Sequence, residues 1–483
     1  MSTPVDSERN SEGTRTRRVA SVVVLCVVAL TYSTLEGMVA PALPVLQQAV
    51  GASPAAIAWV FTGLLLSGTV ASPLIGRLAD VYGPKRVLLA VLGLVALGTL
   101  LAGLAGSMVV LALGQVLQGF GLGFVPLSIA VLSGLRRGAS GKGGVGLIIG
   151  MSGFGTVAGG LLAGPLLTVL PFRFIYWIPL GVLVVTGVLV TWVLPTTAPT
   201  AQRRIDWAGA ALLSGGLVAL LLGITFVPTA GWTSALVVLL LAGAVVLLAS
   251  FFVVERRTAQ PLVDLRVGGR SMVVTYIIGF ATGWAASATF VLLPLIVAAP
   301  TASGYGLGES PLTTGALLTV FGLLGAASAP LAAPLEKAIG ARLLLVLSCL
   351  PLVAAPLVLL FGHPSFPRLV IAAGLIGLGI GLGFSQAMNV VVSAVPVDRI
   401  GSASSTVYVV RGVGSTLGAQ VTGSLLTVTV LPSLGVSAWS GFVVALVIAA
   451  VVAAVATLSA GSLPRGKAGL PVVRPEPVVV AEP

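Results

Sequence analysis

The stretch GRLADVYGPKR, residues 76–86, separates two long apolar runs and determines how the rest of the chain is interpreted. A Gly-Pro pair beginning at Gly83 ends one helix and starts the next, because Gly tolerates the turn and Pro suits a first helical position. Asp80 lies near the end of the first helix, where its carboxylate can accept hydrogen bonds from a neighbouring helix N-terminus. Lys85 and Arg86 are expected to face the aqueous side and the lipid headgroups. The stretch predicts either a breakable charged latch between two rigid bodies or a charged hairpin that only sets topology.

The composition indicates a membrane protein. Of 483 residues, 57% are hydrophobic and only 8% are charged, whereas soluble domains carry roughly 25% charged residues. Apolar runs of about 20 residues, each long enough to cross a bilayer, recur along the chain. We therefore predict an all-α polytopic membrane protein with about 14 transmembrane helices.

The residue pattern gives no support for an enzyme, a cofactor or a metal site. The two cysteines, Cys26 and Cys349, fall inside apolar runs and indicate neither a disulfide framework nor metal binding. The sequence has no nucleotide-binding loop, nucleophile–base pair or cluster of metal ligands. The net charge of +12 is concentrated in short turns, a distribution typical of cytoplasmic membrane loops that argues against a nucleic-acid partner.

The positions of the basic residues also predict the topology. They occupy alternate loops, and an even number of spans then places both termini on the cytoplasmic side of a cell-membrane protein. We expect a disordered cytoplasmic tail at residues 1–18 and a flexible cytoplasmic tail at residues 461–483, on either side of the predicted spans.

The sequence contains an internal repeat. Residues 73–85 are echoed at a constant offset by residues 330–342, with a proline at the start and a glycine at the turn in both copies. The second copy is degenerate, and it lies between the tenth and eleventh predicted spans. Two halves built on one plan are typical of secondary transporters.

Residues 76–86 resemble the signature loop between the second and third helices of the major facilitator superfamily. Six residues stand where the family pattern places them: Gly76, Leu78, Asp80, Gly83, Lys85 and Arg86. Residues 206–209 and 255–265 resemble the flanks of the inserted helix pair in fourteen-span drug:proton antiporters. The resemblance covers about residues 19–460. It implies a six-helix bundle (19–194), the inserted helix pair with its linkers (195–265) and a second six-helix bundle (266–460), with the loop acting as a conformational latch.

Glu36 is the one acid, of thirteen in the sequence, that lies inside an apolar span. An ionised carboxylate is expensive in lipid, so it should face water or a partner. It can exchange a proton for a cationic substrate, or it can brace contacts between helices. The family's first-span acid would align one residue earlier, at Leu35.

Arg411 is the clear intramembrane cation. It lies about twelve residues from the cytoplasmic end of its span, roughly 18 Å deep at the helical rise per residue. Three roles are open for it: attracting anions, pairing with Glu36, or bracing helices.

Two further segments resemble transporter motifs. Gln115 and Gln118 lie in a segment similar to the family's fourth-span motif, with Gln115 at the position of an arginine implicated in proton coupling; both amides can bind substrate or hold helices together. Gly160, Gly164 and Pro165 are similar to the antiporter motif of the fifth span, which favours export, although small residues also serve ordinary helix packing.

Three polar groups at span depth complete the candidate site. Tyr32 is a candidate cavity residue, with packing as the alternative. Gln386 and Asn389 lie three residues apart and share one helix face, so we expect them in a central cavity.

The sequence thus predicts a transporter that exports amphiphilic or cationic small molecules by proton antiport with alternating access. Its partners would be substrate, protons and the lipid bilayer, and it would act as a monomer. The alternative is a lipid or metabolite carrier of the same fold with weak or no proton coupling, because Gln115 replaces the motif arginine.

Overall fold

The computed structural model describes residues 4–52, 54–135, 142–195, 206–258, 269–309, 311–362, 364–396, 399–431 and 436–463. This part of the chain is almost entirely helical, and its sheet is a hairpin of β1 (Val430–Leu431) and β2 (Val436–Ser437). The predicted all-α fold is therefore confirmed. The second predicted tail lies largely outside the described residues, which end at Leu463.

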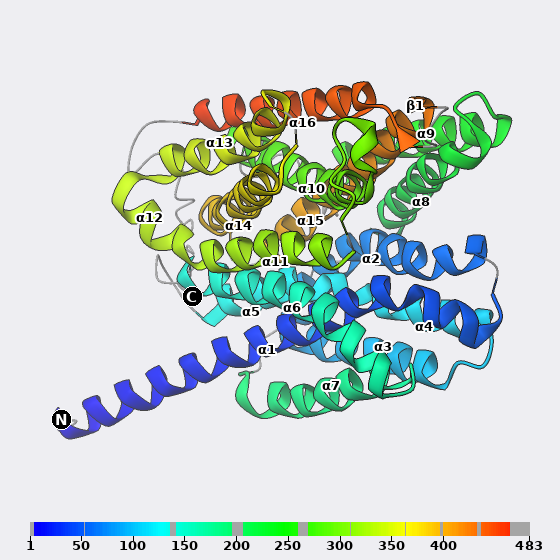
Figure 1. The fold of residues 1–483 in the computed structure, drawn as a ribbon. Helices are drawn as coiled ribbons and strands as arrows, with labels where there is room; N and C mark the ends of the chain where they lie inside the picture. Colours follow the sequence, from blue (N-terminus) through cyan, green and yellow to red (C-terminus); the bar gives the residue numbers. More distant parts are fainter. Residues whose placement is uncertain are drawn as a thin grey trace.

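The first half of the chain forms six long helical segments. They are α1 (Pro4–Val50), α2 (Pro54–Tyr82), α3 (Pro84–Leu104), α4 (Met108–Gly119) continued through η1 (Phe120–Gly123) into α5 (Phe124–Leu135), α6 (Lys142–Val169) and α7 (Phe174–Val193). Since α1 begins at Pro4, residues 4–18 extend the first helix, where the sequence predicts a disordered tail. This end projects beyond the rest of the molecule (Figure 1).

The second half repeats the arrangement. Its segments are α10 (Gly269–Ala298), α11 (Pro311–Ser328) continued through η4 (Ala329–Leu331) into α12 (Ala332–Ile339), α13 (Ala341–Leu360), α14 (Phe366–Ala394), α15 (Ile400–Val428) and α16 (Trp439–Gly461), with a short turn η3 (Thr301–Ser303) after α10. Gly83 between α2 and α3 and Gly340 between α12 and α13 have φ of 91° and 86°. Residues with an L side chain rarely adopt these positive φ values, whereas glycine does so easily. A glycine therefore ends the equivalent helix in each half.

Between the halves, α8 (Trp207–Ala230) and α9 (Ala235–Arg257) form an antiparallel pair. Asp206 caps α8, its Oδ1 accepting from the Gly209 amide at 2.8 Å. Helix α8 contacts α2 of the first half and α15 of the second. Leu213 and Leu217 of α8 share an apolar cluster with Val409 of α15, so the pair packs against both halves.

Twelve helices in the described residues are long and apolar enough to cross a membrane. The long helices outside that set are α2 and α15, of 29 residues each. They pack on each other across the two halves. Twelve candidate spans are thus established, and a fourteen-span count stays a prediction.

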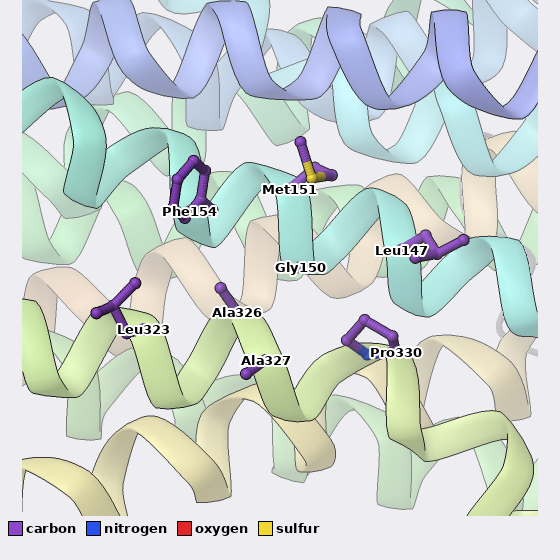
Figure 2. A pocket seen from close by; sticks show the side chains of 8 residues that line it. All are labelled: Leu147, Gly150, Met151, Phe154, Leu323, Ala326, Ala327 and Pro330. Atoms are coloured by element: carbon purple, nitrogen blue, oxygen red, sulfur yellow. The ribbon is translucent and has the colours of Figure 1, made fainter.

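The two halves meet along two seams, α2 with α15 and α6 with α11 (Figure 1). An apolar groove of about 260 Å³ follows the second seam (Figure 2). Leu147 and Phe154 of α6 line one side, and Leu323 of α11 lines the other. All three side chains are about 43–45% exposed. The groove carries no charged side chain and has the character of a lipid-facing surface.

Contact between the halves is concentrated at one end of the helices. One apolar cluster joins Ile75 and Leu132 of the first half to Met272, Val395 and Ile400 of the second. These residues lie near the helix ends that flank the turn at Gly83. A Cβ added at the opposite ends of the seam helices, at Gly164, Gly315 or Gly423, would meet nothing within 4 Å. The halves are therefore closed against each other at the Gly83 end.

Candidate functional site

Helix α15 of the second half packs on α2 of the first half. Two sets of residues, one at its N-terminus and one farther along the helix, interact with the first half. Its N-terminus meets the end of α2, and Arg411 lies as its twelfth residue. Gly283 of α10 approaches the Arg411 backbone so closely that a Cβ there would clash with it. This close packing sets the position of the Arg411 backbone while leaving its side chain at the interface.

The first contact joins Asp80 to the start of α15. Asp80 is 8% exposed, and its Oδ2 accepts a hydrogen bond from the Ser402 amide at 3.1 Å. The positive end of the helix dipole favours a carboxylate at this position. The residue that sequence analysis assigned to a latch therefore contacts the N-terminus of a helix in the other half.

Two glycines allow this approach. A Cβ on Gly401 would lie 2.5 Å from Asp80 Oδ1, and one on Gly76 would lie 2.6 Å from the Gly401 carbonyl oxygen. Real Cβ atoms do not come so close, so both positions require glycine for the helices to meet. We call Gly76, Asp80, Gly401 and Ser402 the latch.

Lys85 belongs to a different contact. Its Nζ donates to the carbonyl of Thr191 at 2.8 Å and to that of Leu194. These carbonyls lie at the end of α7, where the helix dipole favours a cation. Lys85 therefore holds α3 to α7 within the first half, where the sequence predicts a headgroup-facing side chain. Arg86 is exposed.

Asp80→Asn should loosen the latch. Removing the charge from a helix N-terminus costs about 0.5–1 kcal/mol, a factor of about 2–5 in the open population. Ser405→Cys, in a background without Cys26 and Cys349, reports this opening because Ser405 is fully buried against Gly76. Maleimide labelling of this cysteine should accelerate by that factor, whereas Asp206→Asn should leave the rate unchanged. Equal rates with and without Asp80→Asn would contradict the latch assignment.

The second contact lies deeper along α15. The Arg411 guanidinium carbon lies 4.7 Å from the centroid of the Phe384 ring on α14, within the range of a cation–π interaction. The Phe384 ring meets the Tyr408 ring edge-on at 5.0 Å. Arg411 and Tyr408 both lie within electrostatic reach of Glu36 on α1. An acid from the first half thus lies near a cation from the second.

Tyr32 completes this group. It lies one turn before Glu36, on the same face of α1, and interacts electrostatically with it. The Tyr32 ring packs edge-on against Phe124 at 5.4 Å. Among the described residues, neither Tyr32 Oη nor Arg411 Nε has a hydrogen-bond partner, whereas buried polar groups normally have one. We call Tyr32, Glu36, Phe384, Tyr408 and Arg411 the charge cluster.

Sequence reasoning identified three members of the charge cluster and missed Phe384 and Tyr408. Both are aromatic residues at span depth, a position that usually indicates packing. Tyr408 lies three residues before Arg411, a helical neighbour spacing, and this was the available signal. Phe384 is brought in from another helix, and local sequence gives no signal for it.

Gln115 and Gln118 lie inside the first half and are fully buried. Gln115 Nε2 donates to the Tyr176 hydroxyl of α7 at 3.0 Å. The Gln118 backbone lies against Gly98 of α3, and its amide group has no partner among the described residues. Gln115 therefore joins α4 to α7, which corresponds to the packing alternative for this residue.

Tyr176→Phe should destabilise the first half. The substitution keeps the ring and removes the acceptor, so the Gln115 amide would be buried without a partner, at a cost of about 1–3 kcal/mol. Thermal unfolding of the purified protein should show a lower midpoint, and Tyr82→Phe, at a half-exposed position, should not change it. An unchanged midpoint for Tyr176→Phe would show that the bond contributes nothing.

Gln386 and Asn389 lie away from the charge cluster. Asn389 Nδ2 donates to Gln386 Oε1 at 3.2 Å, and both residues are fully buried. At about 100° per residue, they lie roughly 160° and 140° around α14 from Phe384. On the Gln386 side, Gly379 packs against Ser348 of α13. The structure therefore places this pair inside the second half, where the sequence predicts a central cavity.

The glycine motif of α6 contributes less than its pattern suggests. Gly159, and not Gly160, makes the close approach to the Thr34 backbone of α1. A Cβ on Gly160 would find its nearest atom at 3.9 Å, and one on Gly164 would meet nothing within 4 Å. Pro165 is exposed and α6 continues past it to Val169. Gly160 therefore makes only an ordinary contact with α1, and Gly164 makes no close contact.

Comparison with known proteins supports the fold and the family. Among solved structures, the human organic anion transporter MFSD10 (TETRAN) has a TM-score of 0.67 at 18% identity, covering 92% of this chain and 99% of that one. The fucose transporter FucP in the outward conformation has a TM-score of 0.62 at 14% identity, covering 92% and 98%. At these identities the likeness concerns the fold alone.

Sequence relatives include drug-resistance proteins. Multidrug resistance protein Stp of Mycobacterium tuberculosis (strain CDC 1551 / Oshkosh) is 29% identical over 390 residues, 80% of this chain and 71% of that protein. Puromycin resistance protein pur8 of Streptomyces alboniger is 31% identical over 451 residues, 88% of this chain and 84% of that protein. The family model for the Major Facilitator Superfamily matches residues 25–210, 206–419 and 275–481. The chain is a transporter and not an enzyme, and it belongs to the Major Facilitator Superfamily.

Proposed function

We propose that this protein is a fourteen-span antiporter that exports cationic amphiphilic small molecules in exchange for protons. The observation that carries the proposal is the position of Glu36 and Arg411, which bring opposite charges from the two halves into electrostatic reach of each other. Both side chains are partly exposed. The drug-resistance names of relatives such as Stp and pur8 support export as the direction.

The proposed cycle alternates between two states, one in which the halves are closed at the latch and one in which they are closed at the opposite ends of the helices. With the latch closed, the substrate site opens to the other side of the membrane. If the basic loops are cytoplasmic, this is the outward-facing state, in which a proton neutralises Glu36 and a bound cation leaves. Opening the latch and closing the opposite ends exposes the site to the cytoplasm, where a new cation replaces the proton. Both termini lie in the cytoplasm in this arrangement.

The alternative keeps the fold and removes the proton coupling. It is favoured by Gln115, which stands at the family's arginine position and is engaged with Tyr176. Without that arginine, an antiport mechanism in this chain would depend on Glu36 as the group that exchanges the proton. A carrier whose Glu36 only braces helices would move substrate down its own gradient.

Purified protein in lipid vesicles separates these two functions. Vesicles with an acidic lumen should accumulate ethidium through inside-out molecules, and a lumenal pH dye should report proton exit in step with uptake. Nigericin, which dissipates the pH gradient, should abolish accumulation. Equal ethidium uptake with and without the pH gradient would reject the antiporter in favour of the carrier without proton coupling. Ethidium uptake no greater than that of protein-free vesicles would reject both functions.

A further inference from the structure

We propose that Arg411 acts as a built-in competitor that occupies the substrate's place: its guanidinium covers a cation seat formed by the Phe384 ring face and the Glu36 carboxylate. A planar cationic substrate binds by displacing the guanidinium and stacking on Phe384. This inference rests on the proposed export function, and it adds the residues that select the substrate.

The geometry shows that the seat fits a flat cation. The guanidinium is planar and delocalised, and it lies over the Phe384 ring at 4.7 Å. Tyr408 meets the same ring edge-on, which holds the ring plane in one orientation. The Glu36 carboxylate lies within electrostatic reach of the guanidinium and carries the opposite charge. A planar aromatic cation would find the same ring face and the same carboxylate.

The guanidinium is held weakly enough to leave. Its Nε has no hydrogen-bond partner among the described residues, and its attractions include the Phe384 ring face and the charge of Glu36. The side chain is flexible and partly exposed, and long basic side chains can swing towards water while the backbone stays in place. Close packing against Gly283 fixes that backbone. Displacement therefore requires a rotamer change and no movement of α15.

A resident cation also explains how the site tolerates an acid. An ionised carboxylate without a partner is costly at span depth, and Arg411 balances it when no substrate is bound. A monocation exchanges for the guanidinium without changing the charge near Glu36. An organic anion would have to approach Glu36 and the negative face of the Phe384 ring, both of which repel it.

Binding measured in lipid nanodiscs, without any gradient, tests the inference. Arg411→Gln removes the competitor and should tighten ethidium binding about tenfold, because ethidium then no longer has to displace a cation from the face of the Phe384 ring. Phe384→Leu removes the ring and should weaken ethidium about tenfold, with a smaller effect on the non-planar cation tetraphenylphosphonium. Arg270→Gln, at an exposed position, serves as the matched control and should change neither affinity.

The opposite results are equally clear. The inference would be overturned if folded Arg411→Gln protein bound ethidium more weakly than, or as well as, the unaltered protein. It would also be overturned if the unaltered protein bound the organic anion fluorescein and Arg411→Gln abolished that binding. If Arg411→Gln does not fold, Arg411→Lys and Phe384→Leu decide it: equal effects of Phe384→Leu on planar and non-planar cations would reject the stacking seat. Proton coupling does not enter these measurements. If the vesicles showed no gradient-driven uptake but the nanodisc affinities changed as predicted, proton antiport would be rejected and the proposed cation seat would stand.

Discussion

Glu36→Gln is expected to reduce pH-driven accumulation of ethidium to the level of protein-free vesicles while the protein remains folded and in the membrane. Glutamine keeps the size of the side chain and one acceptor oxygen, but it cannot exchange a proton. It also leaves Arg411 without its opposite charge, so the electrostatic link between the halves is lost together with the coupling. Downhill ethidium movement should persist at a reduced rate, because the rocking interface is intact.

Glu309→Gln is the matched control. Glu309 is exposed in the segment between α10 and α11, where its Oε2 accepts from the Thr313 hydroxyl at 3.3 Å. Its substitution changes the same net charge and should leave gradient-driven accumulation intact. Full accumulation by Glu36→Gln, with dye uptake still matched by proton exit, would remove Glu36 from the coupling mechanism.

Gly76→Val and Gly401→Val are each expected to abolish transport without preventing membrane insertion. A side chain at Gly76 would press on the Gly401 carbonyl at 2.6 Å and on the Ser405 hydroxyl. The backbone cannot yield without separating α2 from α15, and separation also removes the hydrogen bond from Ser402 to Asp80. The protein would be unable to close at the latch. It could then not reach the state in which the substrate site opens to the opposite side of the membrane, and alternating access would stop.

The control for this prediction is Gly93→Val on α3, because a Cβ there would meet nothing within 4 Å. Efflux from cells and maleimide labelling of the Ser405→Cys reporter measure the two consequences. We expect efflux near background and fast labelling for Gly76→Val, with both values unchanged for Gly93→Val. Normal efflux by Gly76→Val would mean that latch closure is not required for turnover.

The turns and the isolated acid were predictable because they depend on local chemistry. A Gly-Pro pair at Gly83 ends α2 at Tyr82 and starts α3 at Pro84, since positive φ and a fixed proline ring permit little else. Glu36 is conspicuous in sequence because a charge within an apolar run is costly wherever the helix packs. The repeat of this turn at Gly340 likewise needs no knowledge of tertiary structure.

The neighbours of polar residues within spans could not be predicted from the sequence. Gln386 and Asn389 were expected in the cavity because they share a helix face, but spacing does not say which neighbour that face meets. The packing of Gly379 against α13 decides it. Lys85 was expected near headgroups, but its Nζ reaches the open carbonyls at the end of α7.

The sequence by itself determined that this chain is a helical membrane protein, where its helices turn, and that Glu36 and Arg411 are charges in need of an environment. Only the tertiary structure decided what they meet. Asp80 and Ser402 are 322 residues apart in the chain, and Phe384 reaches Arg411 from a separate helix. Such pairings follow from how whole helices pack, through glycines that bring backbones together, and no local pattern encodes the choice of partner.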